Sequence, residues 1–303
     1  MNLIKKLSLL TALVAVMFAF NACEEDTVAP VEDTPSAPID LQATSINDNT
    51  VHIKWKDASD IDLEQLKDYT ITYYPSNTSS ENAPEMSASK SGDPVEISGL
   101  DMDKEYTFEV VTNYDNGNSS SASMIKWAPA MRFVQVDANT IKLYASDVTA
   151  KGSGLALYED DGLGDFFPTV KTVLQITEWN LGLSTKGGSI KFGSASMLDY
   201  DGASTATESA EVASAIPAES LNAVFDSQAL DNMNYSQDLH DLTNATSSVV
   251  IYVKHTNANN EVHYAKVFLK NVNGSFLQGA AGNQYVEAEI SYQVNAGFPY
   301  AKK

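Results

Sequence analysis

The strongest constraint on the fold of this chain is a two-residue alternation of apolar and polar side chains between positions 38 and 126. Val51, Ile53 and Trp55 alternate with His52 and Lys54. Because successive side chains of a strand point to opposite faces, this period predicts a β-strand with one buried face. The pattern returns at 69–73, 95–97 and 106–110, and turn-forming residues such as those at 115–118 separate the runs. Repeated short strands separated by turns predict a β-sandwich.

Three residues of this segment resemble the fibronectin type III family. Trp55 lies where that family buries the tryptophan of its second strand, and Leu100 precedes Tyr106 by six residues. The Leu–Tyr spacing resembles the tyrosine corner, in which the phenol bonds to the preceding backbone. Met102 and Lys104 replace the usual proline and threonine between them. The resemblance implies a sandwich over 38–126 that acts as a spacer, because a fold does not imply a function.

The remainder of the chain, 127–303, predicts a second, larger β-rich domain, which makes the fold class all-β with at most one or two short helices. Short strands are expected at 140–144, 154–158, 172–176, 189–192 and 285–294. The segment 202–215 is mostly Ala, Ser, Thr and Glu, a composition that suits a surface loop. The best helix candidate is 218–228, because Pro217 suits a first turn and Leu221, Val224 and Phe225 share one helical face.

A hairpin in this half carries two candidate metal ligands. Strands 249–255 and 261–269 flank a short polar loop, and simple closure places Val253 opposite His263. His255 and His263 would then be diagonal neighbours about 7–8 Å apart, and a small register slip would place them directly opposite. Two such imidazoles could bind a transition metal or haem iron. The favoured alternative is that both histidines cover the apolar face at the end of the hairpin.

Two short segments, 178–183 and 251–267, resemble haem-binding lipoproteins of the HmuY type. The resemblance covers little of the chain. It implies a β-rich fold and a bacterial surface setting, without identifying a ligand.

Acidic, glycine-containing turns suggest calcium as a further candidate ligand. The candidate carboxylates are Asp160, Asp161, Asp165, Asp199 and Asp201. Calcium prefers clustered carboxylate oxygens, but the spacing is not that of an EF-hand, and Asp and Gly are also ordinary turn residues. Ordinary turns are therefore favoured, and no bound cofactor is expected. No catalytic sequence motif is present either, so we do not expect an enzyme.

The first 23 residues predict export and lipid anchoring. Lys5 and Lys6 precede an apolar run at 7–20, which is too short to span a bilayer. Ala22-Cys23 then resembles the lipobox of bacterial lipoproteins. We expect 1–22 to be a signal peptide, Cys23 to be acylated, and 23–37 to be an acidic, proline-containing tether. The acids that follow Cys23 resemble an export signal to the outer face of the outer membrane in the Bacteroidetes group.

The charge balance excludes one class of partner. The chain has 40 acidic and 19 basic residues, a formal charge of −21, and Arg132 is its only arginine. Nucleic-acid binding relies on basic patches, so nucleic acid is not expected as a partner. The sequence predicts a surface-exposed outer-membrane lipoprotein that acts as a binding or adhesion module for an unidentified polymer or protein. The alternative is haem or metal capture by the C-terminal domain.

Overall fold

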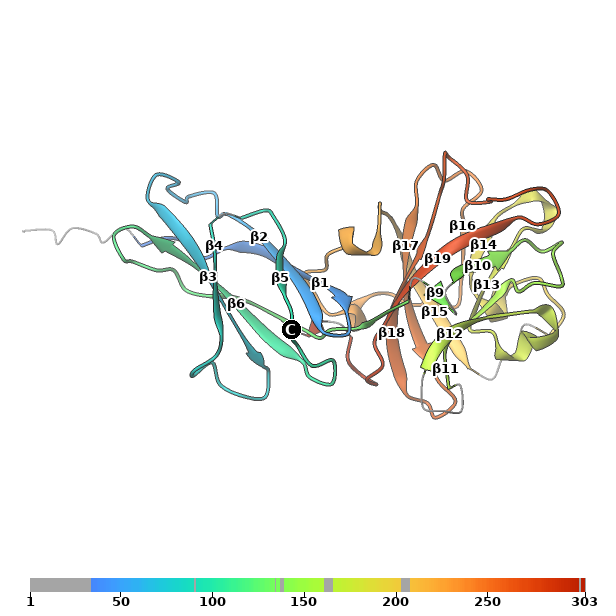
Figure 1. Cartoon of the computed structure of the whole chain (residues 1–303), viewed down its shortest axis with the longest axis horizontal. Helices are drawn as coiled ribbons and strands as arrows, with labels where there is room; N and C mark the ends of the chain where they lie inside the picture. The colour runs from blue at the N-terminus through green and yellow to red at the C-terminus, as the bar shows by residue number, and fades with distance from the viewer. Residues whose placement is uncertain are drawn as a thin grey trace, which may run out of the picture. The chain divides into compact units, whose positions relative to one another are not determined.

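The N-terminal part of the described chain is a sandwich of two antiparallel sheets. The computed structural model describes residues 34–89, 91–133, 135–136, 139–160, 166–202, 208–299 and 301–302. One sheet is ordered β1 (Ile39–Asn47), β2 (Thr50–Lys56) and β5 (Val95–Ile97). The other contains β4 (Glu85–Ala88), β3 (Leu66–Pro75), β6 (Tyr106–Tyr114), β7 (Ser123–Trp127) and the C-terminal β20 (Ala301–Lys302). The β-sandwich predicted from alternation is therefore present (Figure 1).

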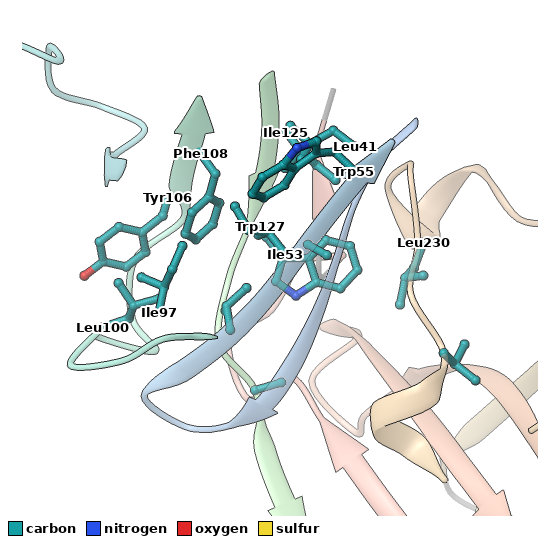
Figure 2. Packing of buried hydrophobic residues seen from close by; sticks show 14 of the residues in the cluster. Leu41, Ile53, Trp55, Ile97, Leu100, Tyr106, Phe108, Ile125, Trp127 and Leu230 are labelled. Carbon is teal, nitrogen blue, oxygen red and sulfur yellow. The ribbon is translucent and has the colours of Figure 1, made fainter. Parts of the chain in front are cut away.

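The predicted tyrosine corner is confirmed. The backbone N–H of Asp101 donates to the phenol oxygen of Tyr106 at 3.0 Å. Trp55 is 1% exposed and packs edge-on against Tyr69, with ring centroids 5.3 Å apart. Large apolar side chains from both sheets, including Trp55, Phe108 and Trp127, form one core, with Leu230 from the C-terminal half beside them (Figure 2).

The C-terminal half contains two further antiparallel sheets. The seven-stranded sheet is ordered β15 (Ser209–Pro217), β17 (Val249–Thr256), β18 (Val262–Leu269), β19 (Tyr285–Tyr292), β10 (Asn139–Tyr144) and β9 (Gln135–Val136), and β8 (Met131–Phe133) also pairs with β19. The five-stranded sheet is ordered β12 (Phe166–Lys171), β11 (Gly154–Asp160), β13 (Leu181–Ser184), β14 (Lys191–Ser194) and β16 (Leu239–Asp241). Short 3-10 segments connect several strands: η1 (Val173–Glu178), η2 (Lys186–Gly188), η3 (Ala195–Met197), η5 (Leu221–Ala223) and η6 (Leu230–Asn232). The expected all-β fold with almost no helix is confirmed.

Both faces of the seven-stranded sheet are buried. Ile251 and Val267 pack into a core shared with the five-stranded sheet. Tyr252 and Phe268, on the opposite face, join the core of the N-terminal sandwich. This double burial explains why β17 and β18 are apolar almost throughout. Residues 35–303 accordingly form one compact unit.

The expected helix at 218–228 is wrong. Only the single 3-10 turn η5 forms there, and Val224 is already extended, with φ −98° and ψ 104°. Asp226 exchanges two backbone hydrogen bonds of 3.0 Å with Ala43 of β1. A helix could not present both backbone groups of Asp226 to another strand, so this long-range pairing overrides the local helical pattern.

Two other local expectations are also wrong. The strand expected at 172–176 is the 3-10 turn η1, and the strand β12 ends just before it. The indole N–H of Trp179 donates to the carbonyl oxygen of Thr172 at 3.0 Å and stabilises this turn. Much of the expected loop at 202–215 is the strand β15, because Ala210 and Val212 are buried in the C-terminal core. Their small or isolated apolar side chains made the two-residue period inconspicuous.

Within the described residues, we found no helix with both the length and the apolar character needed to cross a membrane.

Candidate functional site

A cavity of about 800 Å³ opens where β11, β12, β17, β18 and β19 come together. Both histidines singled out from the sequence, His255 of β17 and His263 of β18, line it. Lys171 and Glu208 contribute charge, and Tyr158 contributes an aromatic side chain. Tyr158 stacks on Tyr292 at a centroid distance of 4.7 Å and an interplanar angle of 14°. A cavity of this volume falls within the range of small-molecule sites.

The hairpin register differs from simple closure. His255 is directly opposite His263, and Val253 is opposite Ala265. The turn is closed by a 3.0 Å hydrogen bond from the N–H of Asn257 to the carbonyl oxygen of Glu261, and Asn260 adopts a positive φ of 62°. Asparagine tolerates this left-handed conformation better than most residues, which suits Asn260 to the end of the turn. The predicted faces of the hairpin are retained, and the two imidazole centroids are 6.2 Å apart.

His255 is held on both ring nitrogens. Its Nδ1 lies 2.8 Å from the phenol oxygen of Tyr292, and its Nε2 lies 2.8 Å from Oε2 of Glu208. His255 is 1% exposed. Glu208 also accepts from the Nδ2 of Asn180 and from the backbone N–H of Ala258, each at 3.2 Å. The hydrogen bond from His255 holds the pKa of Glu208 below its usual value, against the effect of burial.

His263 has a defined tautomer. Its Nδ1 lies 3.1 Å from the carbonyl oxygen of Gln293, which can only accept, so Nδ1 carries the proton. In the neutral ring Nε2 is then an acceptor, and the contact with Nδ2 of Asn257 is 3.4 Å, longer than a normal hydrogen bond. Burial lowers the pKa of His263 below its usual value, and nearby His255 lowers it further.

Lys171 forms the second charged centre of the cavity. Its Nζ lies 2.7 Å from Oε1 of Glu159 and 2.6 Å from Oε2 of Glu178. Burial alone would lower the pKa of Lys171, but its two carboxylate partners outweigh that effect and hold it above the usual value. The lysine therefore remains charged and is already paired with two anions.

The metal and calcium candidates do not form a ligand cluster in the described part of the chain. No group of three His, Cys, Asp or Glu side chains among the described residues is arranged to hold a metal ion. Asp199 and Asp201 are exposed. Asp161, Asp165 and the side chain of Asp160 lie outside the described residues, as does Cys23.

Sequence reasoning identified the two histidines but missed their partners. Glu208 is in a polar segment that was expected to be a loop, and Tyr292 is 37 positions away from His255 in the chain. Lys171, Glu159 and Glu178 carried no recognisable motif. The only available signal was the alternation in 285–294, which placed Tyr292 on a strand but not beside the hairpin.

Comparisons with known proteins identify the N-terminal sandwich. The fibronectin type III domain family matches residues 36–126. The chain is similar to the third fibronectin III domain of the human KIAA0343 protein, with 20% identity, 35% of this chain and 93% of that chain covered, and a TM-score of 0.28. It is also similar to the fn3 domain of the human collagen alpha-1(XX) chain, with 21% identity, coverages of 34% and 92%, and a TM-score of 0.28. No curated protein matches the chain. The chain thus contains a fibronectin type III domain, a type of module that serves in binding, in adhesion or as a spacer.

We expect acid to destabilise the folded chain through His263. Because the folded-state pKa of His263 is depressed, the unfolded state binds a proton more readily, and stability falls as pH decreases through about 6.5. Because only one proton is involved, His263 can change the free energy of unfolding by at most about 1.4 kcal/mol per pH unit. The lowered pKa of Glu208 acts in a separate window, because its stabilising effect is lost only below about pH 4.5.

The measurement is urea unfolding of wild type and His263→Gln at several pH values between 5 and 8. In the variant, the free energy of unfolding should no longer show the decrease that begins near pH 6.5 in wild type. His52→Gln is the matched control, because His52 lies in the N-terminal sandwich and pairs with the exposed Glu96. Equal slopes in wild type and His263→Gln would contradict the assignment.

Proposed function

We propose that this chain is a lipid-anchored, surface-exposed binding protein of a bacterial outer membrane. Cys23 would carry the lipid, and the fibronectin type III domain would hold the C-terminal half away from the membrane. The C-terminal half would bind the ligand. The supporting observation is the 800 Å³ cavity in that half, which brings together charged and aromatic side chains from five strands.

The arrangement of the cavity supports binding rather than catalysis. Fibronectin type III domains are non-catalytic modules, and we extend this to the whole chain. Tyr292 is fully buried, and both nitrogens of His255 already have protein partners. A general acid or base must reach the proton that it transfers. The Tyr292–His255–Glu208 chain of hydrogen bonds is therefore better suited to holding the cavity wall in place.

Haem or metal capture is the less supported alternative. It is favoured by the two histidines on one cavity wall, directly opposite each other. It is opposed by the hydrogen bonds that occupy both nitrogens of His255. A haem group also carries two carboxylates, whereas the one lysine of the cavity is already bound to Glu159 and Glu178. Binding haem would thus cost existing hydrogen bonds and add like charge.

The anchoring part of the proposal predicts that Cys23→Ser releases the protein from the outer membrane or leaves its leader uncleaved. Without the thiol there is no acylation site, and the fibronectin type III domain and cavity lie outside the anchor. Cell fractionation with immunoblotting measures the effect. Thr27→Ser, a conservative change in the same tether, is the control and should remain in the membrane fraction. Identical partitioning of Cys23→Ser and wild type would refute lipid anchoring.

A further inference from the structure

The cavity has an excess of negative charge. Four glutamates, Glu159, Glu178, Glu208 and Glu261, line it, with Lys171 as the only lysine or arginine among its lining residues. With the histidines neutral, the formal excess is three negative charges. A cleft lined by one sign of charge concentrates ions of the opposite sign, and the overall charge of −21 acts in the same direction.

The cavity also offers acceptors more readily than donors. Lys171, its strongest donor, is already bonded to two carboxylates. Glu178 and Glu261 each have a partner on Oε2, Lys171 and Asn257 respectively, while Oε1 of each has no partner among the described residues. A ligand that brings hydrogen-bond donors would therefore satisfy groups that the protein leaves available.

His263 provides an independent indication of the same chemistry. The side chain is only 5% exposed, yet it lines the cavity. The bond of Nδ1 to the Gln293 carbonyl makes Nε2 an acceptor, and the 3.4 Å contact with Asn257 satisfies it poorly. A buried acceptor with such a weak partner is costly unless another donor is supplied. This acceptor is separate from the carboxylates and lies deep in the fold.

We propose that the cavity binds a small organic ligand that carries a protonated amine. The inference rests on the proposed binding function and specifies its ligand class. The ammonium group would donate to Nε2 of His263 and to the carboxylates of Glu178 and Glu261. The ring of Tyr158, which stacks on the buried Tyr292, would line the path of its hydrocarbon part.

Other ligand charges fit less well. An anion would meet three excess negative charges, and the one lysine among the described lining residues already has two carboxylate partners. A neutral polyol could donate hydrogen bonds, but it would gain nothing from the negative potential. Charge therefore predicts that the amine binds most tightly, the neutral ligand less tightly and the anion least tightly.

Isothermal titration calorimetry with three probes of equal chain length tests this order. The probes are 1,5-diaminopentane, 1,5-pentanediol and glutarate, which differ chiefly in charge. We expect the diamine to bind at least about tenfold more tightly than the diol, and glutarate not to bind. Glu261→Gln should weaken diamine binding about five- to tenfold and leave diol binding unchanged. Glu81→Gln, the same change at an exposed site of the fibronectin type III domain, should have no effect.

The pH dependence separates this site from general attraction to an acidic surface. Glu208, Glu261, His255 and Tyr292 surround His263. Even beside these groups, a protonated His263 would have no acceptor nitrogen to offer and would repel the ammonium group. Diamine affinity should therefore fall as pH decreases below about 6.5, and His263→Gln should flatten this fall. Tighter binding of the diol or glutarate would overturn the amine assignment while leaving the binding function in place. No binding of the diamine, or equal binding by Glu261→Gln, would also overturn it, whatever the fractionation of Cys23→Ser shows.

Discussion

Replacing Trp55 by alanine is expected to lower the free energy of unfolding by about 3–5 kcal/mol. Trp55 is 1% exposed and contacts Tyr69 edge-on, so truncation leaves a large cavity between the two sheets of the fibronectin type III domain. The surrounding strands are paired on both sides and can close such a cavity only in part. Urea unfolding followed by circular dichroism measures the loss.

The matched control is Met124→Ala in the same domain. Met124 is also a large apolar residue, but it is 62% exposed, so its truncation should change the free energy of unfolding by less than about 0.5 kcal/mol. A loss below about 1 kcal/mol for Trp55→Ala would mean that Trp55 does not support the sandwich core.

Lys266→Met is expected to cost about 3–5 kcal/mol, because it leaves a buried carboxylate without its cation. Nζ of Lys266 lies 2.5 Å from Oδ2 of Asp226, and the two side chains are 4% and 6% exposed. Asp226 also accepts from the phenol of Tyr252 at 2.6 Å, and its backbone pairs with Ala43 of the fibronectin type III domain. The ion pair therefore lies where the sandwich and the seven-stranded sheet share a core.

Lys254→Met is the control for this substitution. Lys254 forms an ion pair of 2.8 Å with Glu211 on the same sheet, but both side chains are about one-third exposed. Solvent screens such a pair, so its loss should cost no more than about 1 kcal/mol. The double variant Lys266→Met with Asp226→Leu should recover part of the stability, since no charge remains buried. Similar losses for Lys266→Met and Lys254→Met in urea unfolding would refute the special role of the buried pair.

The buried ion pair changes the interpretation of the hairpin. Lys254 is partly exposed and pairs with Glu211. Lys266 is instead a buried charge within the core. Period-two alternation places both lysines on one face but contains no information on what packs against that face.

The sequence alone determined the features that depend on neighbouring residues. Alternation identified the main strands and the sandwich, and the Leu100–Tyr106 spacing identified the tyrosine corner that the Asp101 N–H completes. It also placed His255 and His263 on one face of a hairpin, because side-chain direction depends only on position along a strand.

Only the tertiary structure decided the features that depend on distant partners. Asp226 is extended, and not helical, because its backbone pairs with Ala43, which is 183 positions away in the chain. Glu208 and Tyr292 reach His255 from separate strands or connections, so no local pattern could connect them. The hairpin register followed from the turn at Asn257 and Asn260, which lies one residue further along the chain than simple closure assumes and so places His263 opposite His255. Long-range pairing and packing override local propensity because they contribute more free energy than the small differences between local conformations.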